Sequence, residues 1–184
     1  MIAPILIFAV GNESRGDDAL APLLLRRMDT WLQSEKRFDE FELIEDFQLQ
    51  VEHATDMAGR RMILFLDAGQ DTSEPFTFYR AMASGTPALY SHALAPEALL
   101  DVYLQIYHET APPAFVLCIR GEQFELGSAL SPAAETRLEA AWNFMQDLLK
   151  KTEAVWWEAC CQPTHCIADR TCTVAKTLLP APES

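Results

Sequence analysis

The chain has 184 residues, with 27 acidic side chains against 14 lysines and arginines and a formal net charge of −13. This length fits one globular domain. The excess of negative charge argues against a protein that grips nucleic acid or a membrane of anionic lipid, because those partners need Lys and Arg to neutralise phosphates. Hydrophobic residues make up 49% and charged residues 22%, which excludes global disorder.

The compartment is predicted from the first ten residues and from the cysteines. The apolar start has no basic segment before it, and Gly11 to Glu13 follow where a signal peptide would need a small-residue cleavage site. No uncharged apolar run approaches the roughly 18 to 20 residues that a membrane-spanning helix requires. Four of the five cysteines lie in the last 25 residues, where they cannot cross-link the body as a secreted disulfide framework would. We therefore expect a cytoplasmic protein with reduced thiols.

Apolar runs of strand length alternate with longer segments of helical period, which is typical of an α/β domain with a mostly parallel sheet. The runs expected to form strands are 5–10, 41–47, 62–66, 76–80 (a short edge strand) and 114–119. Helices are expected over 17–31, 49–58, 97–107 and from Ser131 to about Lys150. The fold class predicted is thus a single three-layer domain, a twisted sheet of about five strands with helices on both faces.

The pattern changes after the last long helix. We expect the α/β body to span residues 1–151, and residues 152–184, with three prolines and four cysteines, to form a C-terminal extension whose structure the sequence does not predict. Its soft metal ligands lack the paired C-x-x-C spacing of a structural zinc site, so a loosely ordered extension is favoured over metal binding. These ligands are Cys160, Cys161, His165, Cys166 and Cys172.

Three candidate site residues follow from this topology. In open parallel sheets, ligands gather at the carboxyl ends of the strands, where the connecting loops converge. Asp18 follows the first strand, Asp67 ends the third, and His92 lies in the loop before the next helix. Two carboxylates and an imidazole can hold a divalent cation and leave open positions for water or substrate.

Each candidate also has an ordinary structural interpretation. Asp17 and Asp18 suit the positive end of a helix dipole, a contribution of about 0.3 to 1 kcal/mol. Asp67 before Ala-Gly fits a strand exit that accepts backbone N–H groups, and His92 fits an ordinary loop histidine. Local sequence alone leaves these alternatives open.

Five blocks of the sequence follow one another in order between about residues 4 and 150. They are ILIFAVGNESRGDDALAPLLL, DFQLQVEHATDM, ILFLDAG, SHALAPEALLDVY and PPAFVLCIRGEQFELGSALS. Together they resemble the hydrogenase maturation proteases, which trim the C-terminal extension of the large subunit of nickel-iron hydrogenases. The second and fourth blocks look most like the branch that serves soluble, NAD-reducing bidirectional hydrogenases.

The resemblance implies a specific site and substrate. The metal-binding carboxylate of the family's first loop falls on Asp18, its second acidic ligand on Asp67 and its histidine on His92. The glycine that often follows the first acid is Ala19 here. The implied substrate is a large-subunit precursor that already carries nickel, and no Ser or Cys nucleophile and no organic cofactor are implied.

Two other classes of function compete with this one. A chaperone or binding module could sense nickel in the same precursor without cutting it. An unrelated small-molecule enzyme could use Asp18 and Asp67 as acid and base. Nucleotide binding is disfavoured, because the loop 11–16 has neither G-x-G-x-x-G nor a Walker lysine.

Two further groups receive ordinary interpretations. Glu52 and His53 on the short second helix form a surface ion pair more readily than a second acid and imidazole near the cleft. Cys118, at the end of an apolar run, is most simply a small buried hydrophobic residue.

Overall fold

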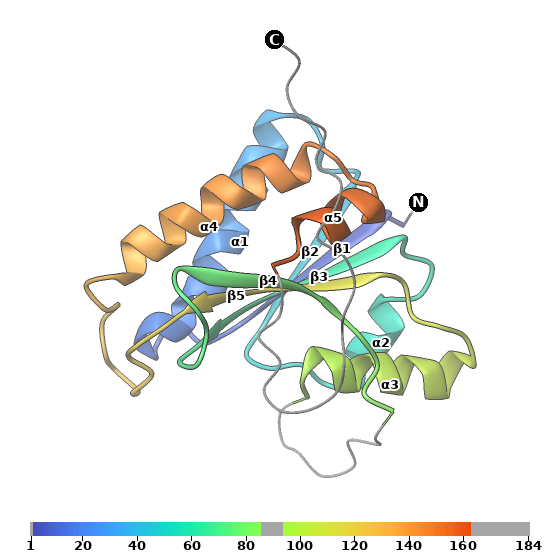
Figure 1. Cartoon of the computed structure of the whole chain (residues 1–184), viewed down its shortest axis with the longest axis horizontal. Helices are drawn as coiled ribbons and strands as arrows, with labels where there is room; N and C mark the ends of the chain where they lie inside the picture. Colours follow the sequence, from blue (N-terminus) through green and yellow to red (C-terminus); the bar gives the residue numbers. More distant parts are fainter. Residues whose placement is uncertain (1, 86–93, 163–184) are drawn as a thin grey trace.

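The computed structural model describes residues 2–85 and 94–162, which form one five-stranded sheet with helices on both faces (Figure 1). The strand order is β2-β1-β3-β5-β4, and all neighbouring strands run parallel except β4, which pairs antiparallel with β5. The predicted α/β class and mostly parallel sheet are confirmed. The strands are β1 (Ile5–Val10), β2 (Phe41–Asp46), β3 (Met62–Gly69), β4 (Phe76–Ala81) and β5 (Ala114–Arg120).

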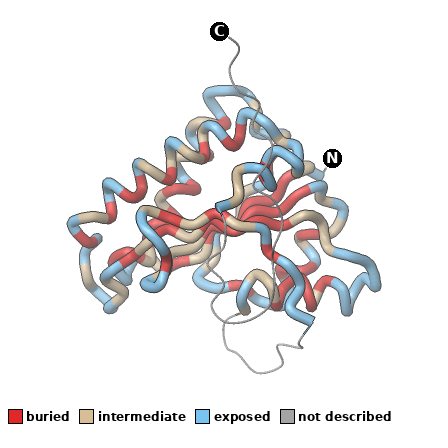
Figure 2. Tube along the Cα trace, viewed as in Figure 1, coloured by how far each residue is buried: buried red, intermediate tan, exposed pale blue. Residues whose placement is uncertain are grey.

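The inner strands are continuously apolar because both of their faces are covered. β1 and β3 each begin with five consecutive buried residues, and β5 with four. Strands covered on both faces have this composition in parallel sheets. The edge strands β2 and β4 mix buried with exposed positions instead (Figure 2).

Helices cover both faces of the sheet. α1 (Leu20–Ser34) and α4 (Ala134–Leu149) lie on one face, and the short α2 (His53–Asp56) and α3 (Pro96–Tyr107) lie on the other (Figure 1). The two core clusters follow the alternation of side chains along the strands, with Leu64 and Leu66 under α1 and α4 but Ile63 and Phe65 under α2 and α3.

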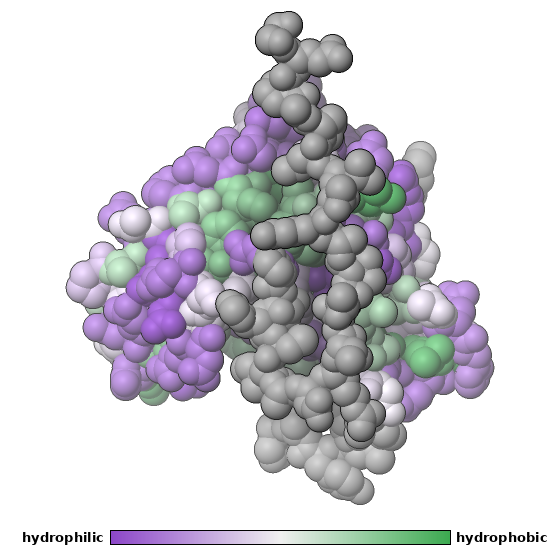
Figure 3. Space-filling view, viewed as in Figure 1, coloured by the Kyte–Doolittle hydropathy of each residue, from purple (hydrophilic) through white to green (hydrophobic). Residues whose placement is uncertain are grey.

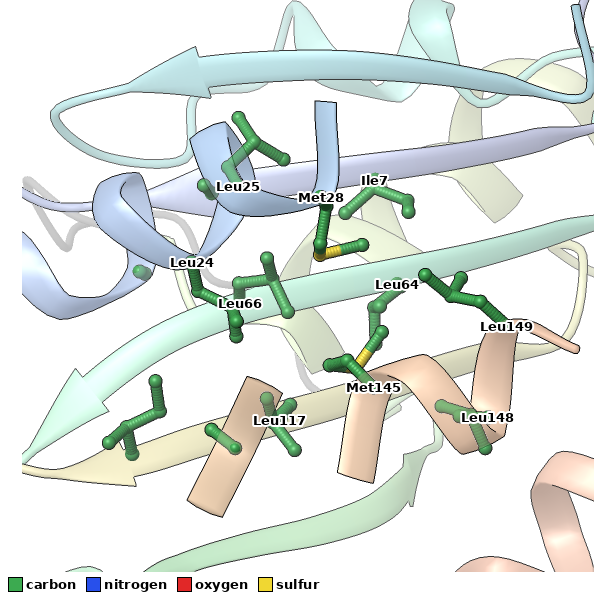
Figure 4. Packing of buried hydrophobic residues seen from close by; sticks show 14 of the residues in the cluster. Ile7, Leu24, Leu25, Met28, Leu64, Leu66, Leu117, Met145, Leu148 and Leu149 are labelled. Atoms are coloured by element: carbon green, nitrogen blue, oxygen red, sulfur yellow. The ribbon is translucent and has the colours of Figure 1, made fainter. Parts of the chain in front are cut away.

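The larger core cluster joins α1 and α4 to the sheet. Close-packed leucine and methionine side chains from both helices meet those of β1, β3 and β5 (Figure 4). Met28 of α1 and Met145 of α4 are both fully buried. This packing fixes α1, and with it the turn that precedes α1, against the sheet.

The expected extension begins with a helix that belongs to the same core. α5 (Ala154–Cys160) places Trp157 against Phe78 and Phe115, with ring centroids 6.4 and 5.4 Å apart. The Trp157 indole is fully buried and donates to the Lys151 carbonyl at 2.8 Å.

Nearby, hydrophobic side chains gather on the surface between α4 and β4, where Phe144 packs against Phe76 (Figure 3). His165, Cys166 and Cys172 lie outside the described residues.

Several boundaries differ from the sequence prediction, most of them by one to three residues. β3 continues to Gly69 rather than ending at Leu66, so Asp67 lies inside the strand. Asp17 and Asp18 belong to η1 (Gly16–Ala19), a single 3₁₀ turn that precedes α1, rather than to the α-helix itself. α2 is shorter than the predicted 49–58. Across the described residues, none of the helices has the length and apolarity to cross a bilayer.

Candidate active site

The candidate site lies at the carboxyl ends of β1 and β3. Asp18 lies in the 3₁₀ turn η1, directly after the loop that leaves β1. Asp67 is the third residue from the end of β3. Because residues alternate between faces along a strand, Asp67 lies on the same face as Ile63 and Phe65, toward α2 and α3.

Asp18 is held by the chain that follows β1. Its Oδ2 accepts a hydrogen bond from the Asn12 amide at 3.0 Å. Gly11 makes this approach possible, because a β-carbon there would overlap the carbonyl oxygen of Asp18. Burial raises the pKa of Asp18, while the Asn12 bond and the Arg15 charge oppose that rise. The carboxylate is therefore oriented, but no cation lies within ion-pair distance of it in the described structure.

Asp67 is the most perturbed carboxyl group of the site. Burial raises the pKa of Asp67 to about 6; a bond from the Ala68 amide at 2.8 Å opposes the rise, and the nearby Asp18 carboxylate adds to it. The two carboxylates thus interact through space, as predicted from the topology. A pair of acids with raised pKa values and little compensation is typical of a functional site.

The wall beside Asp67 is formed by β4 and β5. Cys118 is the register partner of Asp67 on β5, and its Sγ lies 3.0 Å from the Thr72 hydroxyl. Burial raises the pKa of the Cys118 thiol to about 11, so the thiol stays protonated at neutral pH. Cys118 packs against the hydrophobic core, as expected from the sequence, but it is partly rather than fully buried. Burial also raises the pKa of Tyr79, with the Glu97 and Asp67 carboxylates contributing.

His92, the third predicted site residue, lies outside the described residues. The chain resumes at Leu94, whose amide donates to the Leu49 carbonyl in the segment that follows β2. Glu97 in the first turn of α3 then interacts with Tyr79. In the described ranges, with their gap at 86–93, there is no group of three His, Cys, Asp or Glu side chains arranged to hold a metal. The structure thus brings Asp18 and Asp67 together, and His92 stays a prediction.

Asp17 has a structural role that the sequence did not reveal. It is fully buried, and its carboxylate accepts backbone N–H bonds from Ser131 at 2.6 Å and Glu122 at 2.7 Å. Burial works against ionisation, but these bonds outweigh it and lower the pKa of Asp17. Its partners lie more than a hundred residues away, which explains why only a helix-dipole role was visible in the sequence.

His53 is also placed differently from the prediction. It is buried rather than on the surface, and its Nε2 lies 3.4 Å from Asp46 at the end of β2, not beside Glu52. Its Nδ1 accepts the Gln50 amide at 3.0 Å, and its ring packs on Phe8. The side chain therefore fixes the segment after β2 on the sheet.

This arrangement offers anionic oxygen ligands at a sheet edge, a donor set suited to a divalent or transition-metal cation. The sequence matches no protein-family model and no curated protein. Comparison of structures is informative instead. Hydrogenase maturating endopeptidase HybD from Escherichia coli aligns with a TM-score of 0.59 and 22% identity, over 79% of this chain and 91% of that one. The chain has the fold of a hydrogenase maturation endopeptidase.

A second solved structure supports the same fold. The [NiFe] hydrogenase maturation protease HycI from Thermococcus kodakarensis aligns with a TM-score of 0.58 and 20% identity, over 81% of this chain and 94% of that one. Each match leaves about a fifth of this chain uncovered, while nearly all of the other protein is matched.

Proposed function

We propose that this protein is a hydrogenase maturation protease: an endopeptidase that removes the C-terminal extension of a nickel-iron hydrogenase large-subunit precursor after nickel has been inserted. The observation that carries the proposal is the placement of Asp18 and Asp67, whose carboxylates interact electrostatically, at the carboxyl ends of β1 and β3 in a sheet with this fold. The collinear sequence blocks support the same conclusion, and two of them favour a precursor from a soluble NAD-reducing hydrogenase in the cytoplasm.

The carboxylates give the site its chemistry. Asp18 and Asp67 carry negative charge that burial makes unfavourable, so a cation brought in by the precursor relieves a cost already present in the free protein. We infer that both carboxylates and His92 reach the nickel in the precursor and hold the extension beside it. The metal then polarises the scissile carbonyl or positions a water, and no Ser or Cys nucleophile is needed.

The experiment is to measure the mass of a nickel-loaded precursor after incubation with the wild type and with His92→Ala. His108→Ala, which removes an exposed histidine at the far end of α3, is the matched control. We expect the wild type and the control to shorten the precursor and His92→Ala to leave it uncut. Equal processing by His92→Ala would remove His92 from the site. A precursor that the wild type binds but never shortens would instead indicate a nickel-sensing binding module.

A further inference from the structure

Two loops at the carboxyl edge of the sheet are joined into one unit. The first follows β1 and carries Asp18, and the second follows β5 and spans residues 121–131. The Arg15 guanidinium donates to the Phe124 carbonyl at 3.0 Å, and the Gly127 amide donates to the Ser14 carbonyl at 2.7 Å. These bonds link segments that are more than a hundred residues apart in the chain.

Asp17 forms the centre of this unit. Its two carboxylate oxygens accept three backbone N–H groups of the second loop, from Ser131, Glu122 and Gln123 at 2.6, 2.7 and 3.4 Å. Its own amide donates to the Gln123 carbonyl at 2.8 Å. A carboxylate is needed here because only two acceptor oxygens can face N–H donors on both sides. The side chain is fully buried, so water cannot replace a lost bond.

The neighbouring glycine shows how closely the loops fit. Gly16 has a φ of +57°, and a β-carbon there would lie 2.5 Å from the Ser128 hydroxyl and 2.6 Å from the Gln123 carbonyl oxygen. Asp17 and Gly16 therefore fix the 3₁₀ turn against the second loop. Because Asp18 belongs to the same turn, the contact between this turn and the loop 121–131 also sets the backbone position of Asp18.

We propose that Asp17 is a positioning residue, which sets the Asp18 carboxylate for the reaction by anchoring its turn to the loop 121–131. The consequence for cleavage rests on the proposed function. The anchoring of Asp18 by Asp17 does not rest on that function. The hydrogen bond from the Asn12 amide to Asp18 Oδ2 reports the position of Asp18 without any substrate. Asp17 itself is fully buried and its carboxylate is bonded to backbone groups, so its side chain has no exposed surface for a precursor to contact.

The test compares Asp17→Asn with the wild type and with Arg60→Ala in the full chain. Asparagine keeps the shape but turns an NH₂ group toward a backbone N–H. Arg60 bonds to the Ala3 carbonyl and Glu42 at the opposite end of the sheet, so its loss controls for general destabilisation. Hydrogen exchange at the Asn12 amide and the kcat and KM for a nickel-loaded precursor are measured at a temperature where all three proteins are folded.

We expect Asp17→Asn to speed exchange at Asn12 by about tenfold and to lower kcat by about tenfold or more, with KM little changed. Arg60→Ala should leave both values at the wild-type level. Exchange at Asn12 that matches Arg60→Ala would overturn the proposal, as would faster exchange with an unchanged kcat. If the wild type cuts no precursor, the proposed function fails while the exchange result still decides the anchoring. If Asp17→Asn does not fold, Gly16→Ala replaces it, because the added β-carbon separates the same two loops. The same changes in Asn12 exchange and in kcat are then expected of Gly16→Ala.

Discussion

The carboxylates of the candidate site, Asp18 and Asp67, are held differently from those at the amino end of the sheet. At the amino end, the Arg37 guanidinium holds the pKa of Glu40 below its usual value, and Arg60 bonds Glu42 at 2.7 Å. At the carboxyl end, burial raises the pKa of both Asp18 and Asp67. The amino-end acids are paired with arginines, whereas Asp18 and Asp67 have little compensation within the described residues. Other acids at the carboxyl end are compensated, Asp17 by backbone N–H groups and Glu13 by Arg26.

This difference assigns separate tasks to the acidic residues. When the protein folds, an acid such as Glu40 loses hydration. The attraction of a neighbouring cation offsets part of that loss. Within the described residues, Asp67 accepts one amide bond and has a second carboxylate as a neighbour. Such a site costs stability in the free protein, and it is ready for a positive ligand.

The largest stability effect should lie far from the site, in α5. Trp157→Ala empties a fully buried position against Phe78 and Phe115, and we expect it to lower the free energy of unfolding by about 3 to 5 kcal/mol. Urea denaturation of the full chain measures this loss, with exposed Trp156→Ala as the matched control. Equal effects of both changes would mean that α5 does not belong to the core.

Asp67→Asn should stabilise the protein at neutral pH. The raised pKa of about 6, against 3.8 for the free side chain, means that the folded state binds this proton more tightly than the unfolded state. Wild-type stability is therefore expected to fall as the pH rises from about 4 to 6, by up to about 3 kcal/mol at about 1.4 kcal/mol per pKa unit.

Urea denaturation of wild type and Asp67→Asn at pH 4 and pH 7.5 checks this sign. The variant should be more stable than the wild type at pH 7.5 and nearly equal to it at pH 4. A variant that is less stable at pH 7.5 would show that the Asp67 charge is compensated in the folded protein.

The smallest effect is expected for an exposed ion pair near the site. Arg26 pairs with Glu13 and Glu45 on the surface, where water and salt screen the charges. Arg26→Ala should leave the urea midpoint unchanged within error. A clear loss of stability would mean that exposed ion pairs contribute to the charge balance around Asp18 and Asp67.

The fold and the carboxylate pair could be predicted because their signals are local. Continuous apolar runs indicate buried strands, and a sheet of parallel strands brings their carboxyl ends together, which places Asp18 near Asp67. The length of β3 was missed because its apolar run is interrupted by Asp67 and ends in Gly69, yet these residues still pair with β5.

The missed features depend on contacts between distant parts of the chain. Asp17 looks like any acid at a helix start until the loop 121–131 folds onto it. His53 looks like a surface residue until β2 places Asp46 beside it. Trp157 lies in a segment without helical period, and the rings that it packs on, Phe78 of β4 and Phe115 of β5, are distant in the chain.

The proposal stands on Asp67, the carboxylate at the end of β3 whose burial is unfavourable, recognising the nickel of the precursor. The most direct measurement is the single-turnover cleavage rate of nickel-loaded and nickel-free precursor by the wild type and by Asp67→Asn, which keeps the fold. We predict that the wild type cuts only the nickel-loaded precursor and that Asp67→Asn cuts it about a hundredfold more slowly or not at all. Cleavage by Asp67→Asn at the wild-type rate, or equal cleavage of both precursors by the wild type, would contradict the claim.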